Sequence, residues 1–113
     1  MNFNSTELEK RKFPRQTVSL STNILENKTA NVLGNCILVD ISKEGFAFES
    51  ETKFSIGQQF SLELIILNRK VVLSGKVIRV CDGFFYPLYG VQIVDTDCTN
   101  LEFFRNYIDY SLN

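Results

Sequence analysis

The stretch KRKFPR concentrates positive charge near the start of the sequence, in a pattern suited to binding an anion. Its cationic residues are Lys10, Arg11, Lys12 and Arg15. Pro14 disfavours helix at the residue before it and lacks a backbone donor, so we expect an extended or turned segment. In an extended chain Arg11 and Arg15 point to the same side, roughly 13 Å apart, and their guanidinium groups suit phosphate oxygens or the O6/N7 edge of guanine. A solvated charge run is the alternative interpretation.

A second polar segment, DISKEG, follows an apolar run and offers a carboxylate beside a hydroxyl. On a strand, Asp40 and Ser42 share one face while Val39 and Ile41 face the core. A carboxylate accepts two N–H bonds at once, which matches guanine N1–H and its N2 amino group. Gly45 permits a positive φ or a close backbone approach. Asp, Ser and Gly also form ordinary turns, so this segment alone does not separate a binding site from a turn.

The sequence offers little for catalysis or metal binding. It contains no histidine, which excludes Ser–His and Cys–His nucleophile pairs, and no two carboxylates are convincingly paired. Three widely spaced cysteines, Cys36, Cys81 and Cys98, form no C-x-x-C motif and are expected to be reduced and to pack as small apolar residues. We therefore predict a binding module with no catalytic residue, no metal and no cofactor, rather than an enzyme.

Length and composition favour one small globular domain. The chain has 113 residues, is 44% hydrophobic and contains ten Phe, enough for a real core. A net charge of -1 argues against binding a nucleic acid polymer, although a local basic patch still suits a small anion. No segment reaches the roughly 18 apolar residues that span a bilayer, and the polar start MNFNSTELEK does not resemble a signal peptide. We expect a cytoplasmic protein without membrane insertion.

Hydrophobic periodicity predicts a mainly β chain that ends in one helix. Expected strands cover residues 16–25, 36–42, 46–50, 60–67, 70–80 and 89–95, with a hairpin turn at Asn68 and Arg69 and a bend at Gly75. Residues 99–112 show helical spacing, and Thr99 with Glu102 forms a capping-box pattern. This order fits a six-stranded antiparallel barrel with a C-terminal helix. Residues 1–9 are expected to be a flexible leader before a domain over 10–113.

The aromatic residues are expected mostly in the core. Phe46 and Phe48 alternate on one strand face, and the helix carries several more. The loop GFFYPLYG holds Phe84, Phe85, Tyr86 and Tyr89. We expect it to fold back over the barrel end, with an exposed patch for a protein partner as the alternative.

Taken together, the two polar segments resemble the PilZ domain family. R-x-x-x-R at Arg11 and Arg15 is followed by D-x-S-x-x-G at Asp40, Ser42 and Gly45, and then by SIGQQFSLEL, LSGKVIRV and YGVQIVD in the family's order. Each motif alone is loose, but their order and spacing together are specific. The resemblance covers about residues 10 to 110.

The resemblance implies a six-stranded β-barrel that binds the bacterial second messenger cyclic di-GMP. It implies that Arg11 and Arg15 contact phosphate and the O6/N7 edge of guanine, and that the Asp40 carboxylate accepts hydrogen bonds from guanine. It also implies that Gly45 lets the backbone come close to the ligand. It also implies an N-terminal segment that becomes ordered on binding and signals to an unidentified downstream protein in motility or biofilm control. The ligand-binding residues carried over are Lys10, Arg11, Arg15, Asp40, Ser42 and Gly45.

Two other functions stay open at this point. Some PilZ members bind no nucleotide and act as adaptors, for example in type IV pilus or motility control, but these usually lack the motif residues that this chain keeps. A single-strand nucleic-acid binder would need a basic, aromatic strand face, which is not seen in the sequence. Lys43, Arg79 and Gly90 are second-rank candidates for ligand contacts. We expect a monomer or weak homodimer that binds one or two nucleotides.

Overall fold

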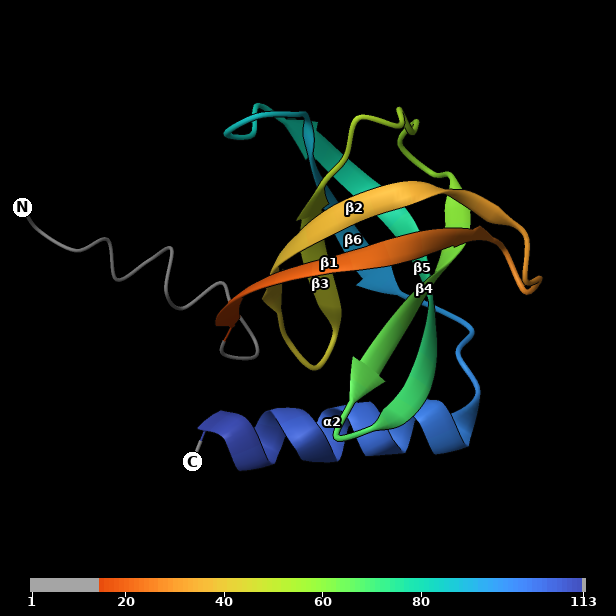
Figure 1. The fold of residues 1–113 in the computed structure, drawn as a ribbon, viewed down its shortest axis with the longest axis vertical. Helices are drawn as coiled ribbons and strands as arrows, with labels where there is room; N and C mark the ends of the chain where they lie inside the picture. Colours follow the sequence, from red (N-terminus) through yellow and green to blue (C-terminus); the bar gives the residue numbers. More distant parts are fainter. Residues whose placement is uncertain (1–14, 113) are drawn as a thin grey trace, which may run out of the picture.

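The computed structural model describes residues 15–112, which form a closed antiparallel barrel with one helix (Figure 1). The strands follow the order β1-β2-β3-β6-β5-β4 around the barrel. The predicted fold class, a six-stranded barrel with a C-terminal helix, is confirmed. The elements are β1 (Gln16–Glu26), β2 (Val32–Ile41), β3 (Gly45–Glu49), β4 (Gln59–Ile66), β5 (Arg69–Cys81), β6 (Leu88–Ile93) and α2 (Cys98–Leu112).

An aromatic cluster fills the barrel. Phe48 lies 5.5 Å from Phe60 and 5.4 Å from Tyr89 between ring centroids, so rings from three strands meet at ordinary aromatic packing distances. The Tyr89 hydroxyl accepts a hydrogen bond from the Phe54 backbone N–H at 3.1 Å, which satisfies both buried polar groups. The predicted core position of Phe46 and Phe48 is confirmed. Tyr89, which the sequence placed both in the aromatic loop and at the start of the last predicted strand, lies buried in β6.

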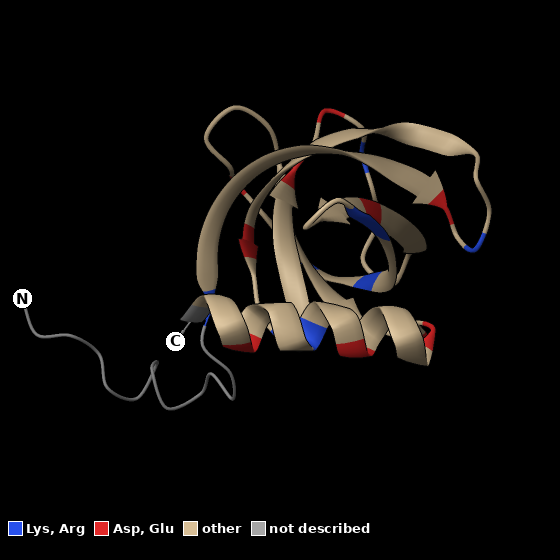
Figure 2. Cartoon of the chain, turned by 60° about the horizontal axis from the view of Figure 1, so that its bottom comes forward, with Lys and Arg blue, Asp and Glu red and all other residues tan. Residues whose placement is uncertain are grey.

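Helix α2 packs across the base of the barrel, next to β5 and the β4–β5 hairpin (Figures 1 and 2). Phe104 and Ile108, four residues apart, are fully buried in the same core as the strands. Arg69 stacks on the Phe103 ring at 4.3 Å to its centroid. In Figure 2, acidic and basic segments are interspersed along the helix. Within residues 15–112 no helix is long and apolar enough to cross a membrane.

The helix begins one residue earlier than predicted and uses a different cap. Asp97 Oδ2 accepts from the Asn100 backbone N–H at 3.1 Å, and Leu101 N–H donates to the Asp97 carbonyl at 2.9 Å. Asp97 is therefore the N-cap residue, and the capping box predicted from Thr99 and Glu102 is wrong.

Two strand details also differ from the prediction. The β4–β5 turn is formed by Leu67 and Asn68, both with positive φ, whereas Arg69 already belongs to β5. The irregularity of β5 lies between Val77 and Arg79 rather than at Gly75. A methyl group at Gly75 would lie 2.4 Å from a Val91 side-chain carbon, so that glycine makes room for core packing.

Candidate ligand-binding site

Strand pairing brings the described end of the basic segment to the DISKEG segment. Arg15 immediately precedes β1, whose register with β2 pairs Gln16 with Ile41 and Thr17 with Asp40. Arg15 Nη1 then lies 3.0 Å from Asp40 Oδ1, although the two residues are 25 positions apart in sequence. Their side chains are 31% and 26% exposed, so the pair is open to a solute.

The turn between β2 and β3 is closed by its own hydrogen bonds. Ser42 N–H donates to the Gly45 carbonyl at 2.8 Å, and Ser42 Oγ donates to the same oxygen at 3.3 Å. Ser42 is nearly buried, so its hydroxyl first holds the turn. The expected pattern, with Val39 facing the core and Asp40 beside Ser42, is altered by an irregularity in the β2–β3 pairing between Leu38 and Asp40, which buries Leu38 instead.

Gly45 is required because two backbones meet closely there. A Cβ at this position would lie 2.2 Å from the Val91 carbonyl oxygen of β6. Among the glycines of the described chain, Gly57 and not Gly45 has a positive φ. The sequence analysis gave two reasons for a glycine at position 45, a positive φ or a close backbone approach. The close approach applies, and the approaching backbone is that of strand β6.

Helix α2 holds the same turn from outside. Lys43 Nζ lies 2.6 Å from Asp109 Oδ1, and Arg105 Nε donates to the Lys43 carbonyl at 3.0 Å. Arg105 and Asp109 stand four residues apart and thus share one helix face. The sequence analysis did not predict this contact, because the spacing of Arg105 and Asp109 indicates a shared helix face but not the segment that this face meets. Lys43, a second-rank ligand candidate, is engaged by the helix.

The other second-rank candidates lie together on strands β5 and β6. Arg79 pairs with Gly90, and its guanidinium nitrogen Nε would lie 3.0 Å from a Cβ at that glycine. The glycine thus gives the Arg79 side chain room to lie against β6, and Gly90 also pairs with Ala47 of β3. Lys10 and Arg11 precede the described residues 15–112, so their placement stays a prediction.

The cysteines and carboxylates of residues 15–112 form no cluster of three or more able to hold a metal ion. Burial raises the pKa of Cys36 to about 12, so its thiol stays protonated at neutral pH. It packs as a small apolar residue, as predicted, whereas Cys81 and Cys98 are exposed.

Comparison with solved structures shows the same fold. The inhibitor of motility MotI/DgrA of Bacillus subtilis aligns with a TM-score of 0.72 at 14% identity, over 91% of this chain and 51% of that one. The PilZ domain of CeSA from a cellulose-synthesizing bacterium aligns at 0.66 and 11% identity, over 88% and 99%. YcgR of Escherichia coli, in complex with c-di-GMP, aligns at 0.67 and 16% identity, over 91% and 46%.

This chain therefore spans about half the length of MotI and of YcgR and nearly the whole CeSA domain. No curated protein matches the sequence. The protein-family model described as PilZ domain matches residues 9–110, which include both polar segments and every strand. The chain belongs to the PilZ domain family.

Proposed function

We propose that this domain is a receptor for cyclic di-GMP that signals to a partner protein and catalyses no reaction. The observation that carries the proposal is the 3.0 Å contact between Arg15 and Asp40, from segments far apart in sequence and beside the Ser42–Gly45 turn. The likeness to YcgR, whose structure holds c-di-GMP, supports the same ligand. Cyclic di-GMP is a dianion with two guanines. A cation suits its phosphates and the guanine acceptors, and a carboxylate suits the guanine donors, so a neighbouring pair of the two groups matches this ligand.

Each group in this pair has a chemical counterpart on the nucleotide. The Arg15 guanidinium is a fixed fork of donors that fits guanine O6 and N7 or a phosphate. The Asp40 carboxylate accepts from guanine N1–H and N2–H. Because a carboxylate has about four lone-pair sites, Asp40 can accept hydrogen bonds from guanine and still keep a hydrogen bond from Arg15.

The turn gives this site a rigid floor. Its two internal hydrogen bonds and its contacts with α2 hold the turn beside Asp40 in place before a ligand arrives, which lowers the entropic cost of binding. We propose that Lys10 and Arg11 complete the site by contacting the phosphates. Binding would then fix the N-terminal segment against the barrel, and a partner would sense that change.

An adaptor that acts by protein contact alone is the second candidate. The observation that favours it is the exposure of Phe84 and Phe85, which were expected to cover the barrel end. An adaptor does not need Arg15 or Asp40, so nucleotide binding separates the two functions.

Isothermal titration with cyclic di-GMP tests the receptor proposal. We expect saturable binding at micromolar or tighter affinity for the wild type and loss of binding for Arg15→Ala. The matched control is Lys28→Ala, which removes another surface cation paired with a carboxylate, Asp95, at 2.6 Å. The control should bind as the wild type does, and the titration also gives the stoichiometry.

Absence of heat in the wild type at high nucleotide concentration would reject the receptor and leave the adaptor. Equal loss in Arg15→Ala and Lys28→Ala would mean that binding is general charge attraction rather than a site at Arg15.

A further inference from the structure

The loop over residues 82–87, here called the aromatic loop, exposes apolar surface. Phe84 is 83% exposed and Phe85 is 73% exposed, and their rings meet edge to face at 4.5 Å between centroids. Single exposed apolar residues are common on protein surfaces, but a pair of aromatic rings in edge-to-face contact on a loop is the kind of group that anchors interfaces. The expectation that this loop covers the barrel end is not met for these two side chains.

One carboxylate holds the aromatic loop in shape. Glu49, the last residue of β3, accepts from the backbone N–H groups of Phe84, Phe85 and Tyr86 at 3.0, 2.9 and 3.2 Å. A Cβ at Gly83 would lie 2.1 Å from the Tyr86 carbonyl oxygen and 2.8 Å from the Glu49 side chain, so a glycine is needed where the loop turns back beside Glu49. The exposed aromatic pair is thus presented by a fixed backbone, which reduces the entropy lost on binding.

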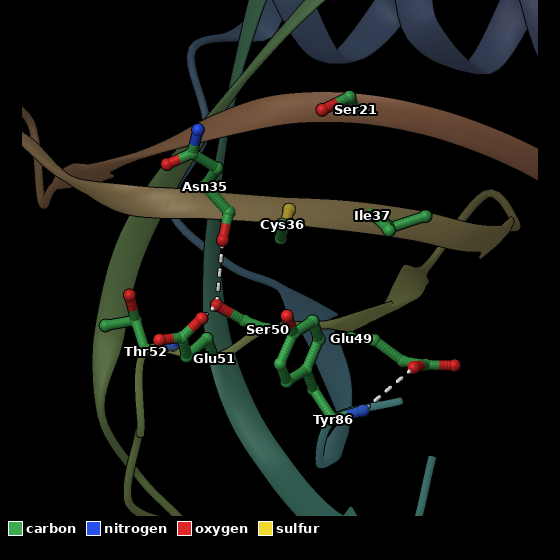
Figure 3. A pocket seen from close by; sticks show the side chains of 9 residues that line it. All are labelled: Ser21, Asn35, Cys36, Ile37, Glu49, Ser50, Glu51, Thr52 and Tyr86. Atoms are coloured by element: carbon green, nitrogen blue, oxygen red, sulfur yellow. Dashed lines mark hydrogen bonds between the residues drawn. The ribbon is translucent and has the colours of Figure 1, made fainter. Parts of the chain in front are cut away.

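A hollow of about 650 Å³ adjoins the loop on its Tyr86 side (Figure 3). Figure 3 shows the Tyr86 ring pointing toward Ser50 and β2, where it forms one wall. Among the lining residues within 15–112, Glu49 and Glu51 carry carboxylates and none carries a positive charge. The lining residues are Ser21, Asn35, Cys36, Ile37, Glu49, Ser50, Glu51, Thr52 and Tyr86.

We propose that the aromatic loop and this hollow form a docking surface for a partner protein with a basic, apolar segment. A Lys or Arg of the partner would enter the hollow toward Glu51, while apolar side chains cover Phe84 and Phe85. The negative charge of the lining favours a positively charged partner, and the two exposed rings supply the apolar anchor.

Two other occupants fit these charges less well. An anionic lipid surface would bring its headgroups against Glu49, Glu51 and Asp82. A symmetric pair of copies would place the same patch on both sides, so that Glu51 faces acidic residues of the other copy. A positively charged partner would be repelled neither as anionic lipid headgroups are nor as a second acidic copy of this surface is.

Strand β3 connects this surface with the candidate nucleotide site. Gly45 stands at one end of the five-residue strand and Glu49 at the other, so the sites are about 13 Å apart along it. The docking surface does not rest on nucleotide binding, because its residues differ from those of the nucleotide site.

The test is an NMR titration of the labelled protein, without nucleotide, with two synthetic peptides. In one, Lys and Arg alternate with Leu and Phe; in the other, Glu replaces each Lys and Arg. We expect the basic peptide to give saturable shifts at the amides of Phe84, Phe85 and Glu51, and the acidic peptide to give none. Affinity for the basic peptide should fall at least tenfold in Phe84→Ser/Phe85→Ser and in Glu51→Lys.

Tyr110→Ser is the matched control, since Tyr110 is an aromatic residue 81% exposed on α2, and it should bind the peptide as the wild type does. The variants Phe84→Ser/Phe85→Ser and Glu51→Lys should both keep the wild-type response to cyclic di-GMP, which separates this proposal from the receptor proposal. Equal binding of both peptides, shifts away from the loop, or unchanged affinity in the double variant would overturn it. So would sedimentation showing a dimer that Phe84→Ser/Phe85→Ser abolishes, or loop-dependent binding to anionic phosphatidylserine vesicles.

Discussion

The ion pair between Arg15 and Asp40 is better suited to exchanging partners than to holding the barrel together. Both side chains are partly exposed, and pairs of this kind stabilise a fold by only about 0–1 kcal/mol. A ligand that offers donors to Asp40 and acceptors to Arg15 therefore loses little by loosening their contact. The same exposure lets a solute reach both groups.

Asp40→Asn should separate binding from stability. The amide replaces one acceptor with a donor, which cannot pair with guanine N1–H or N2–H, so we expect affinity for cyclic di-GMP to fall about tenfold to a hundredfold. The free energy of unfolding in urea should change by less than about 1 kcal/mol, because the lost ion pair is exposed. Titration calorimetry and urea unfolding measure the two effects.

Asp95→Asn is the control for this change. Asp95 belongs to the exposed pair with Lys28, and its positive φ is tolerated by Asn. A similar loss of affinity in both variants would mean that Asp40 acts through net charge and does not read guanine.

Gly45→Ala should destabilise the barrel where β3 meets β6. The new methyl group would lie 2.2 Å from the Val91 carbonyl oxygen, and two paired backbones must move to admit it. Overpacking of this kind costs about 1–3 kcal/mol or more, measurable as a lower urea midpoint. Gly34→Ala adds the same methyl group against the end of the Thr52 side chain, which can rotate, so it should cost less. Equal costs would show that the β3–β6 approach is not the reason for the glycine.

At the scale of elements, the sequence predicted which segments form strands more accurately than it predicted where each strand begins and ends. Strand β2 begins at Val32, although Gly34 and Asn35 favour a turn, because pairing of Leu25 with Val32 and Ile24 with Gly34 extends the ladder. The turn after β4 falls on Leu67 because hairpin register, with Ile66 opposite Arg69, places it there. Local propensity gives way to pairing in both cases.

The candidate site likewise combines features that the sequence predicted with features that only the folded chain determines. The residue types of Asp40, Ser42 and Gly45 were evident from the motif, but the contact of Asp40 with Arg15 depends on strand register. The anchoring of the turn by Arg105 depends on how α2 docks, which no local pattern specifies. The backbone of the aromatic loop at Phe84 and Phe85 is bonded to Glu49, 35 positions before Phe84 in the chain.

Acid should loosen the aromatic loop. The backbone N–H groups of Phe85 and then Phe84 lower the pKa of Glu49 from its ordinary value of 4.5, with a smaller contribution from Tyr86 and partial opposition from burial. Because the folded-state pKa is depressed, the support that Glu49 gives the loop is complete above pH 4.5 and is lost as pH falls through the folded pKa. A carbon-detected NMR titration should show the Glu49 carboxyl and the Phe85 amide changing together below pH 4.5.

Glu49→Gln should speed hydrogen exchange at the amides of Phe84 and Phe85 at neutral pH, because the charged acceptor is gone. Glu51→Gln, a neighbouring acidic residue without these bonds, should leave that exchange unchanged. Unaltered exchange in Glu49→Gln would show that the loop is held by other contacts.

At the scale of the whole molecule, barrel and helix share one core. Phe104 and Ile108 of α2 are buried with Leu38, Phe48 and Phe60 of the strands, so neither part keeps its apolar face covered without the other. A domain of this size normally unfolds in one cooperative step. Stabilisation at one site should therefore be shared by every element.

Nucleotide binding should raise the melting temperature of the helix and the barrel together. A ligand at a hundred times its Kd stabilises a folded protein by about 2.7 kcal/mol, which for a domain of roughly 100 residues raises Tm by about 10 °C or more. Helical circular dichroism reports α2, and the methyl NMR signals of Leu38 report the barrel core. Both signals should shift equally in the wild type and not at all in Arg15→Ala. If the barrel signal shifted alone, α2 would be independent of the core, and its contacts with Lys43 could not couple the helix to the nucleotide site.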